Sequence, residues 1–284
     1  MTAAELLWQP FTEFSFMRHA LAACLALAIG CAPVGVFLVL RRMSLVGDAL
    51  SHAILPGAAL GFILFGLSLT AMSLGGLAVG LAVMIGAGAV TRAGALREDA
   101  SFAAFYLISL SLGVLLVSRW GSNLDLMHIL FGSVLAVDDG ALLFLAGVTS
   151  LTLVMLALFY RMWVVDSFDP EYLRSLGKSG AVGHGVFLGL VVLNLVAGFQ
   201  ALGTLMAVGL MMLPAVSARL WARSLPGQIG MAMGIAAVSA YVGLLLSYHG
   251  NLPSGPAIVL TAGAIYLLSL LAAMAFRRGL SYRS

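Results

Sequence analysis

The sequence predicts an all-α membrane protein, because apolar residues dominate it and charged residues are scarce. Sixty-two per cent of its 284 residues are hydrophobic, whereas soluble proteins contain about 45–50%. Only 9% are charged, against about 25% in soluble proteins. Fourteen basic and 11 acidic side chains could not cover a soluble sphere of this size, so lipid must solvate most of the surface. A soluble enzyme, an extracellular scaffold and a disordered region are excluded.

Nine apolar stretches are long enough for membrane helices, each of which needs about 20 mainly apolar residues. In chain order they are 16–40, 45–66, 71–91, 102–117, 141–160, 185–200, 202–216, 227–248 and 256–276. The sixth and seventh are short and nearly continuous, so they form either two broken spans or one bent element. We therefore expect one polytopic transmembrane domain over residues 1–284, with about nine spans, or eight if those two are one element.

Basic residues lie mainly after the odd-numbered spans, and this predicts the orientation. Those residues are Arg41, Arg42, Arg92, Arg97, Arg161, Arg174, Lys178, Arg219, Arg223, Arg277, Arg278 and Arg283. The opposite side has only Arg18 and Arg119. Cytoplasmic loops carry the excess of Lys and Arg, so we expect the N-terminus outside and the C-terminus in the cytoplasm. No basic run is typical of nucleic-acid binding.

Small residues are frequent inside the expected spans. Glycines four apart at 57–61 and 76–80 allow helix backbones to approach closely, which favours tight packing where lipid gives no hydrophobic drive. Cys24 and Cys31 lie two helical turns apart in the first span, too far for a disulfide within one helix. We expect both to be small core residues.

Asp48 and His52 are the residues that least fit a membrane interior. If Arg42 marks the cytoplasmic edge, the helical rise puts Asp48 about 9 Å and His52 about 15 Å inside it. An Asp at the centre of a span costs about 2.5–3.5 kcal/mol on insertion scales. Side chains four residues apart project from one helix face, and a carboxylate with an imidazole suits zinc or manganese.

Two interpretations of this pair stay open on the residues alone. One is a transient metal site, which needs further ligands because one Asp and one His cannot fill a coordination shell. The other is a structural hydrogen bond that ties two helices together. Pro56 leaves the carbonyl of His52 without its helical donor, which predicts a kink at that point.

The other histidines are weaker candidates. His128 in an outer loop and His249 at the outer end of the eighth span could help to collect a cation at the entrance, although solvated histidines are the simpler interpretation. His19 lies near the outer boundary. We expect His184, on the inner side, to be solvated.

The cytoplasmic loop 161–184 contains the longest polar stretch of the chain. Asp169 followed by Pro170 and Glu171 is typical of a helix start, and Gly177 is typical of a helix stop. A short helix is therefore expected on the cytoplasmic face.

That short helix would present an apolar stripe formed by Phe168, Tyr172 and Leu176, which are four residues apart. An exposed apolar stripe on a charged loop indicates a docking surface for a soluble partner; the alternative is a helix that lies on the lipid interface. The run Gly-Lys-Ser at 177–179 is not a phosphate loop, because Tyr172 stands where a second glycine is needed. Nucleotide energy must come from another subunit.

Four segments together resemble the ABC-transporter permeases that import zinc and manganese in bacteria. Residues 41–57, RRMSLVGDALSHAILPG, closely resemble the signature of that family. Residues 125–137 resemble its outer-loop motif, residues 167–177 its cytoplasmic motif, and residues 202–220 its late-span motif. The resemblance extends over nearly the whole chain.

The resemblance implies a permease of the bacterial inner membrane, related to the cobalamin and iron-siderophore importers. Two copies would form a homodimer with the pathway between them, resting on a cytoplasmic ATP-binding subunit and receiving the ion from an extracytoplasmic metal-binding protein. The chain itself would not be an enzyme and would hold no tight cofactor. Asp48 and His52 would meet the metal. The residues coupled to the ATPase would be Phe168, Asp169, Pro170, Glu171, Tyr172, Leu176 and Gly177.

Zinc is the expected ion, because imidazole suits zinc whereas manganese prefers oxygen donors; the alternative is the same machine importing manganese. A secondary transporter working alone would show several buried carboxylates and an inverted repeat, and the sequence has neither. An intramembrane enzyme would need a second acid or more ligands. Lys178 and Ser179 depart from the family motif, in which an aliphatic continuation is expected.

Overall fold

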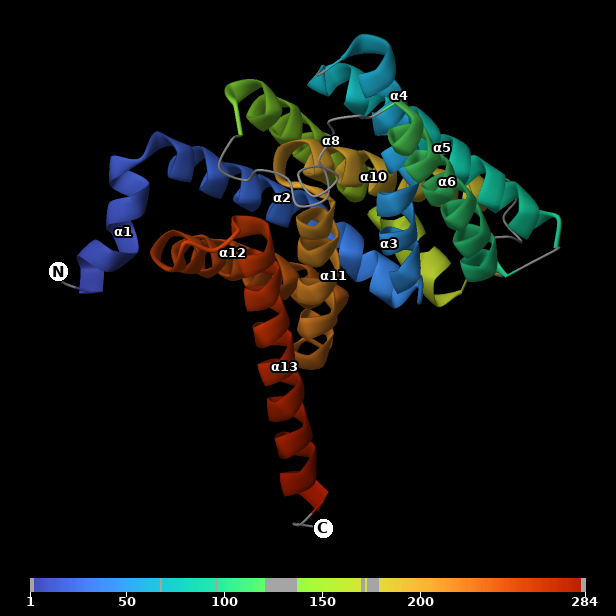
Figure 1. The fold of residues 1–284 in the computed structure, drawn as a ribbon. Helices are drawn as coiled ribbons and strands as arrows, with labels where there is room; N and C mark the ends of the chain where they lie inside the picture. Colours follow the sequence, from blue (N-terminus) through green and yellow to red (C-terminus); the bar gives the residue numbers. More distant parts are fainter. Residues whose placement is uncertain are drawn as a thin grey trace.

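The computed structural model is a bundle of α-helices, without a strand in the part of the chain that it describes (Figure 1). It describes residues 3–66, 68–94, 97–120, 137–169, 172 and 179–281. Within these ranges nine helices are long and apolar enough to cross a membrane. The prediction of nine spans is confirmed, while the orientation of the termini stays a prediction.

The helices agree with the expected spans and extend most of them by a few residues. In chain order they are α1 (Ala3–Glu13), α2 (Ser15–Leu40), α3 (Ser44–Ala53), α4 (Leu55–Phe65), α5 (Leu69–Arg92), α6 (Glu98–Trp120), α8 (Asp139–Phe168), α10 (Ser179–Leu202), α11 (Thr204–Trp221), α12 (Leu225–Gly250) and α13 (Ser254–Ser281). α3 and α4 together form the second span. α10 and α11 are separate helices, because Gly203 adopts a positive φ of 94° between them.

α2 lies at the centre of the bundle, where it contacts α8, α10, α11 and α12. Most of α2 and α10 is buried, whereas most of α5, α6 and α8 faces outward. Close approach depends on glycine: a Cβ at Gly35 of α2 would overlap the backbone of Met211 in α11. The short α1, which the sequence did not predict, lies beside the bundle, where the Tyr241 hydroxyl donates to the Leu7 carbonyl at 3.0 Å.

α3, α4, α5 and α6 form a second group of packed helices, drawn together on the right of Figure 1. The backbones of Gly57 in α4 and Gly75 in α5 touch, because a Cβ on either would overlap the carbonyl of the other. Gly76 packs against the side chain of Ile54, whose Cγ2 would lie 2.6 Å from a Cβ at this position. The expectation that these glycines serve helix packing is confirmed.

Polar side chains join α2, α8 and α10 inside the bundle. The Asn194 amide donates to the Thr152 hydroxyl at 2.8 Å and to the Leu190 carbonyl at 2.9 Å. The thiol of Cys31 donates to the Asn194 carbonyl oxygen at 3.6 Å. Cys24 and Cys31 are both free and buried, as expected of core residues.

Candidate functional site

Asp48 and His52 lie in one cavity between α3, α11 and α13. Its volume is about 250 Å³. Its lining consists of Asp48, Ser51, His52, Thr204, Leu205, Val208, Gly209 and Val259. The first three come from α3 and the next four from the beginning of α11, so the break at Gly203 places the first turn of α11 against the polar face of α3.

The two polar side chains are close but not bonded. His52 Nε2 lies 3.7 Å from Asp48 Oδ1, beyond the 2.7–3.2 Å of a hydrogen bond. The Asp48 side chain is 58% exposed. His52 Nδ1 is buried without a hydrogen-bond partner among the described residues. The pair therefore does not form the hydrogen bond between two helices that was one of the two interpretations. Both residues belong to α3, and their nearest atoms are too far apart for a hydrogen bond.

One chain supplies only part of a metal shell. No group of three or more His, Cys, Asp or Glu side chains that could hold a metal occurs in the described ranges. The cavity nevertheless contains a carboxylate, an imidazole and two hydroxyls, from Ser51 and Thr204. Such a set suits transient contact with a divalent cation better than tight storage, because stable sites need about four protein ligands or more.

The second span is broken beside His52, as Pro56 predicts. α3 ends at Ala53 and α4 begins at Leu55. The Ala53 carbonyl accepts a hydrogen bond from the Ser109 hydroxyl of α6 at 2.9 Å. Because a helix break leaves backbone groups that lipid cannot satisfy, this bond from a neighbouring helix stabilises the break.

A second polar site, the Arg41 cluster, lies where α2, α6, α8 and α10 meet at their expected cytoplasmic ends. It consists of Arg41, Glu98, Asp166, Ser167 and His184. Arg41 Nη1 contacts Asp166 Oδ2 at 2.9 Å, and the two side chains are only 5% and 16% exposed. Arg41 Nε donates to the Ser167 hydroxyl at 3.3 Å. His184 lies between Arg41 Nη1, at 3.3 Å, and Glu98 Oε1, at 2.8 Å.

Burial governs the electrostatics of Arg41. Desolvation lowers the pKa of its guanidinium, and the nearby carboxylates of Asp166 and Glu98 oppose that shift. The guanidinium also lies 4.3 Å from the centre of the Phe187 ring. The expectation that His184 is merely solvated is wrong: it is 30% exposed and paired with Glu98, which stands 86 residues earlier in the chain.

The start of the expected coupling helix is partly described. The Tyr172 amide donates to the Asp169 carboxylate at 3.0 Å, which is the geometry of an N-cap, and Tyr172 is helical. Phe168 and Tyr172 are 69% and 55% exposed. The outward-facing apolar stripe is confirmed for these two residues. Four further predicted residues lie outside the described ranges: Pro170, Glu171, Leu176 and Gly177.

The expected entrance histidines are not brought to the cavity by the described structure. His128 lies outside the described residues. His249 is exposed at the end of α12 and packs edge-on against the ring of Tyr248. His19 pairs instead with Asp139, at 3.5 Å. A role for His128 or His249 at the entrance stays a prediction.

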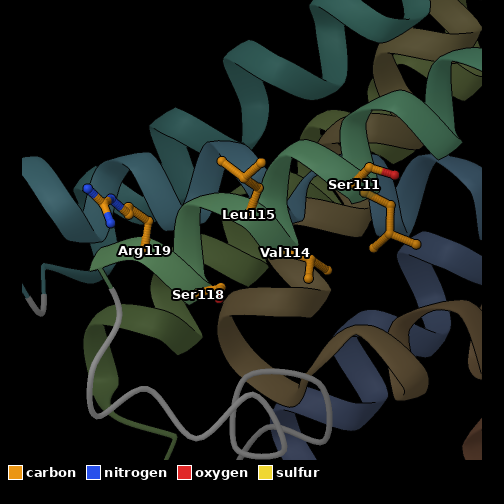
Figure 2. A pocket seen from close by; sticks show the side chains of 6 residues that line it. Ser111, Val114, Leu115, Ser118 and Arg119 are labelled. Carbon is orange, nitrogen blue, oxygen red and sulfur yellow. The ribbon is translucent and has the colours of Figure 1, made fainter.

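A larger hollow, of about 810 Å³, lies elsewhere, along α6 (Figure 2). Its described lining consists of Leu110, Ser111, Val114, Leu115, Ser118 and Arg119, all from α6. Among these six residues Arg119 is the ionisable group, and a cationic side chain repels a metal ion. The smaller cavity with Asp48 and His52 is therefore the better candidate.

Comparison with known proteins gives a consistent result. A family model, the ABC 3 transport family, matches residues 13–273. The chain is 34% identical to the manganese import system permease protein ScaB of Streptococcus gordonii, over 92% of each chain. It is 34% identical to the manganese transport system membrane protein MntC of Listeria monocytogenes, over 91% of each.

A solved structure is similar over the same extent. The chain aligns with a chain of PsaBC from Streptococcus pneumoniae, determined in complex with Fab, with a TM-score of 0.82. The two are 33% identical, and the alignment covers 94% of this chain and 95% of that one.

Proposed function

This chain belongs to the ABC 3 transport family, and on that premise we propose that it is the membrane permease subunit of an ATP-driven manganese importer. It is a multi-pass protein of the bacterial inner membrane and not an enzyme, since ATP hydrolysis in an ABC transporter belongs to a separate subunit. The proposal names the transported ion, the residues that meet it and the partners.

Manganese replaces zinc as the favoured ion. The expectation of zinc depended on one imidazole, whereas the two relatives described above, ScaB and MntC, are named as manganese systems. The cavity lining also favours manganese, because three of its four polar side chains, Asp48, Ser51 and Thr204, carry oxygen and oxygen donors suit manganese.

The incompletely partnered pair of Asp48 and His52 is the observation that carries the proposed site. Placing ionisable groups inside a span is costly, and here their cost is not offset by a hydrogen bond between them. A cation in the cavity would supply the missing interaction. With two ligands from one copy, the remaining coordination positions of the ion are open to water or to a second copy of the chain. This fits a homodimer with the pathway at its interface.

Two further partners complete the importer. The exposed apolar side chains of Phe168 and Tyr172 are where we place the ATP-binding subunit. A metal-binding protein delivers manganese from the opposite face. The loop expected over 161–184 is shorter than predicted, because α8 continues to Phe168 and α10 begins at Ser179. ATP-driven closure of the ATPase pair then moves the segment at Phe168–Tyr172 and opens the Asp48–His52 cavity alternately to the two sides.

Uptake in proteoliposomes tests the proposal. Vesicles would contain this chain, its ATPase and its delivery protein, with manganese and zinc in competition. We expect ATP-dependent manganese entry that equimolar zinc does not suppress. Replacing Asp48 and His52 together with Ala should abolish entry, because both protein ligands are lost, while assembly with the ATPase is retained.

A matched control is the other Asp–His pair, His19 and Asp139, which lies outside the cavity. Its double alanine variant should keep uptake. Preferential entry of zinc would overturn the choice of ion. Normal uptake by the Asp48 and His52 double variant would overturn the site, and entry without any ATPase would favour a secondary transporter.

A further inference from the structure

We propose that the first half of α6, from Glu98 to Ser109, links the cytoplasmic segment at Phe168–Tyr172 mechanically to the metal cavity, with Glu98 and Ser109 as positioning residues at the two ends of this half. This inference rests on the proposed transport function and adds to it the route by which the ATPase side acts on His52. Neither residue contacts the ion; each is inferred to act through the helices that it holds.

The first end of α6 is fixed in the Arg41 cluster. Glu98 is the first residue of α6, and its carboxylate accepts from His184 Nε2 at 2.8 Å. The other ring nitrogen of His184 faces Arg41 Nη1, which can only donate. His184 thus bridges Arg41 and Glu98 through its two ring nitrogens.

Arg41 continues this chain of contacts to the docking segment. Its guanidinium binds Asp166 and Ser167 at the end of α8, directly before the N-cap residue Asp169. A displacement of the segment at Phe168–Tyr172 by a bound ATPase therefore reaches Glu98 through three charge-assisted contacts: Asp166 with Arg41, Arg41 with His184, and His184 with Glu98. Such contacts are shorter and stronger than neutral hydrogen bonds.

The other part of α6 contacts the broken span at the cavity. The ring of Tyr106 lies 5.9 Å from the ring of His52. One turn further along α6, the buried Ser109 hydroxyl bonds to the Ala53 carbonyl at 2.9 Å. A shift of α6 would therefore move the end of α3 and the His52 ring with it.

The residues of α6 that contact the broken span all lie on one face of the helix. Tyr106, Ser109 and Gly113 stand at intervals of three and four residues, so they project from the same side. A Cβ at Gly113 would lie 3.1 Å from Pro56, which means that α6 packs closely on the first turn of α4. This face therefore contacts the break on both sides.

The helix between the two ends is regular and short. Glu98 and Ser109 are separated by 11 residues, or about 16 Å at the helical rise. The intervening sequence DASFAAFYLI contains neither Gly nor Pro, so no flexible position interrupts it. A rigid helix with one end at each site is the kind of contiguous element that carries coupling between distant sites.

The test compares two acidic residues of one helical turn. Glu98→Ala removes the contact with His184, whereas Asp99→Ala removes an equal charge from an exposed neighbour that has no hydrogen bond or ion pair with the described residues. The measurement is manganese imported per ATP hydrolysed in proteoliposomes that contain the whole transporter. We expect Glu98→Ala to lower this ratio about fivefold or more, the low end of coupling between sites. Asp99→Ala should leave it unchanged.

Two further variants separate coupling from mere folding. Glu98→Gln restores an acceptor for His184 and should couple better than Glu98→Ala. Ser109→Ala removes one hydroxyl at the other end and should also lower the ratio while uncoupled ATP hydrolysis continues. If both ends belong to one link, the double variant Glu98→Ala with Ser109→Ala loses less than the product of the single losses.

The outcomes distinguish this inference from the proposed function. Wild-type import of manganese with normal coupling in Glu98→Ala and in Ser109→Ala overturns the link through α6 and leaves the importer standing. If the double variant loses the full product of the two single losses, Glu98 and Ser109 act independently, and this result would also overturn the link through α6. Absence of wild-type import would instead refute the proposed function.

Discussion

The Arg41 cluster and the Asp48–His52 cavity contain similar side chains under opposite conditions. Arg41 is 5% exposed and has polar contacts with Asp166, Ser167 and His184. Asp48 is 58% exposed, and its nearest basic atom lies 3.7 Å away. Each region has one buried nitrogen without a partner among the described residues, Arg41 Nη2 and His52 Nδ1, so the difference lies in the close ion pair of Arg41 with Asp166. Because a buried charge is costly unless it is paired, the ion-paired cluster stabilises the fold, whereas Asp48 and His52 remain available to a cation.

The largest effect on stability should come from the cluster. Arg41→Met leaves the half-buried Asp166 without its cation, and breaking such a pair costs about 3–5 kcal/mol. We expect a matching loss in the free energy of unfolding, measured by denaturant titration in detergent. The control is Arg42→Met, since Arg42 is exposed and surface changes cost about 0.5 kcal/mol or less. If Arg41→Met and Arg42→Met lost equal free energy of unfolding, the Arg41 cluster would not have the stabilising role that distinguishes it from the cavity.

A smaller effect is expected where the partners are polar but uncharged. Asn194→Leu removes the bonds to Thr152 and Leu190, and hydrogen bonds between membrane helices contribute about 0.6–1.7 kcal/mol. Thermal unfolding in detergent would measure the loss. Thr261→Val is the comparison variant, because the Thr261 hydroxyl bonds only to the Ala257 carbonyl of its own helix. A loss as large as that of Arg41→Met would show that charge is not what distinguishes the cluster.

The smallest effect on stability should come from the cavity. Asp48→Asn keeps the size of the side chain and breaks no hydrogen bond with His52, so the free energy of unfolding should change by about 0.5 kcal/mol or less. Manganese uptake by the same preparation should fall severely, because an amide is a poor ligand beside a carboxylate. A large loss of stability would assign Asp48 to the fold, against the proposed role.

The sequence predicted features that depend on neighbouring residues. The spans follow from local hydropathy, and the break beside His52 follows from Pro56 alone. The start of the cytoplasmic helix follows from Asp169 and Pro170. α1 was not expected because its 11 residues are too few to span a membrane. All of these are properties of one continuous segment.

What the sequence did not predict depends on residues far apart in the chain. Glu98 and His184 look like ordinary loop residues until the fold brings α6 and α10 together. Thr204 reaches the cavity only because the chain turns at Gly203. The expectation of zinc depended on one His in the motif, whereas the Thr204 hydroxyl, one of the oxygens that favour the proposed manganese, comes from a distant helix.

The contact between Gly57 and Gly75 limits how this sequence can vary over evolutionary time. Neither residue has a side chain, and a Cβ on either would overlap the other's backbone. A clash between two large residues can be relieved by shrinking one, but no residue is smaller than glycine. Substitution at either position therefore has no compensating change at the other. It must displace α4 or α5, and a shift of α4 moves the break at Ile54, so tolerance to substitution is narrow at two residues that lie outside the Asp48–His52 cavity.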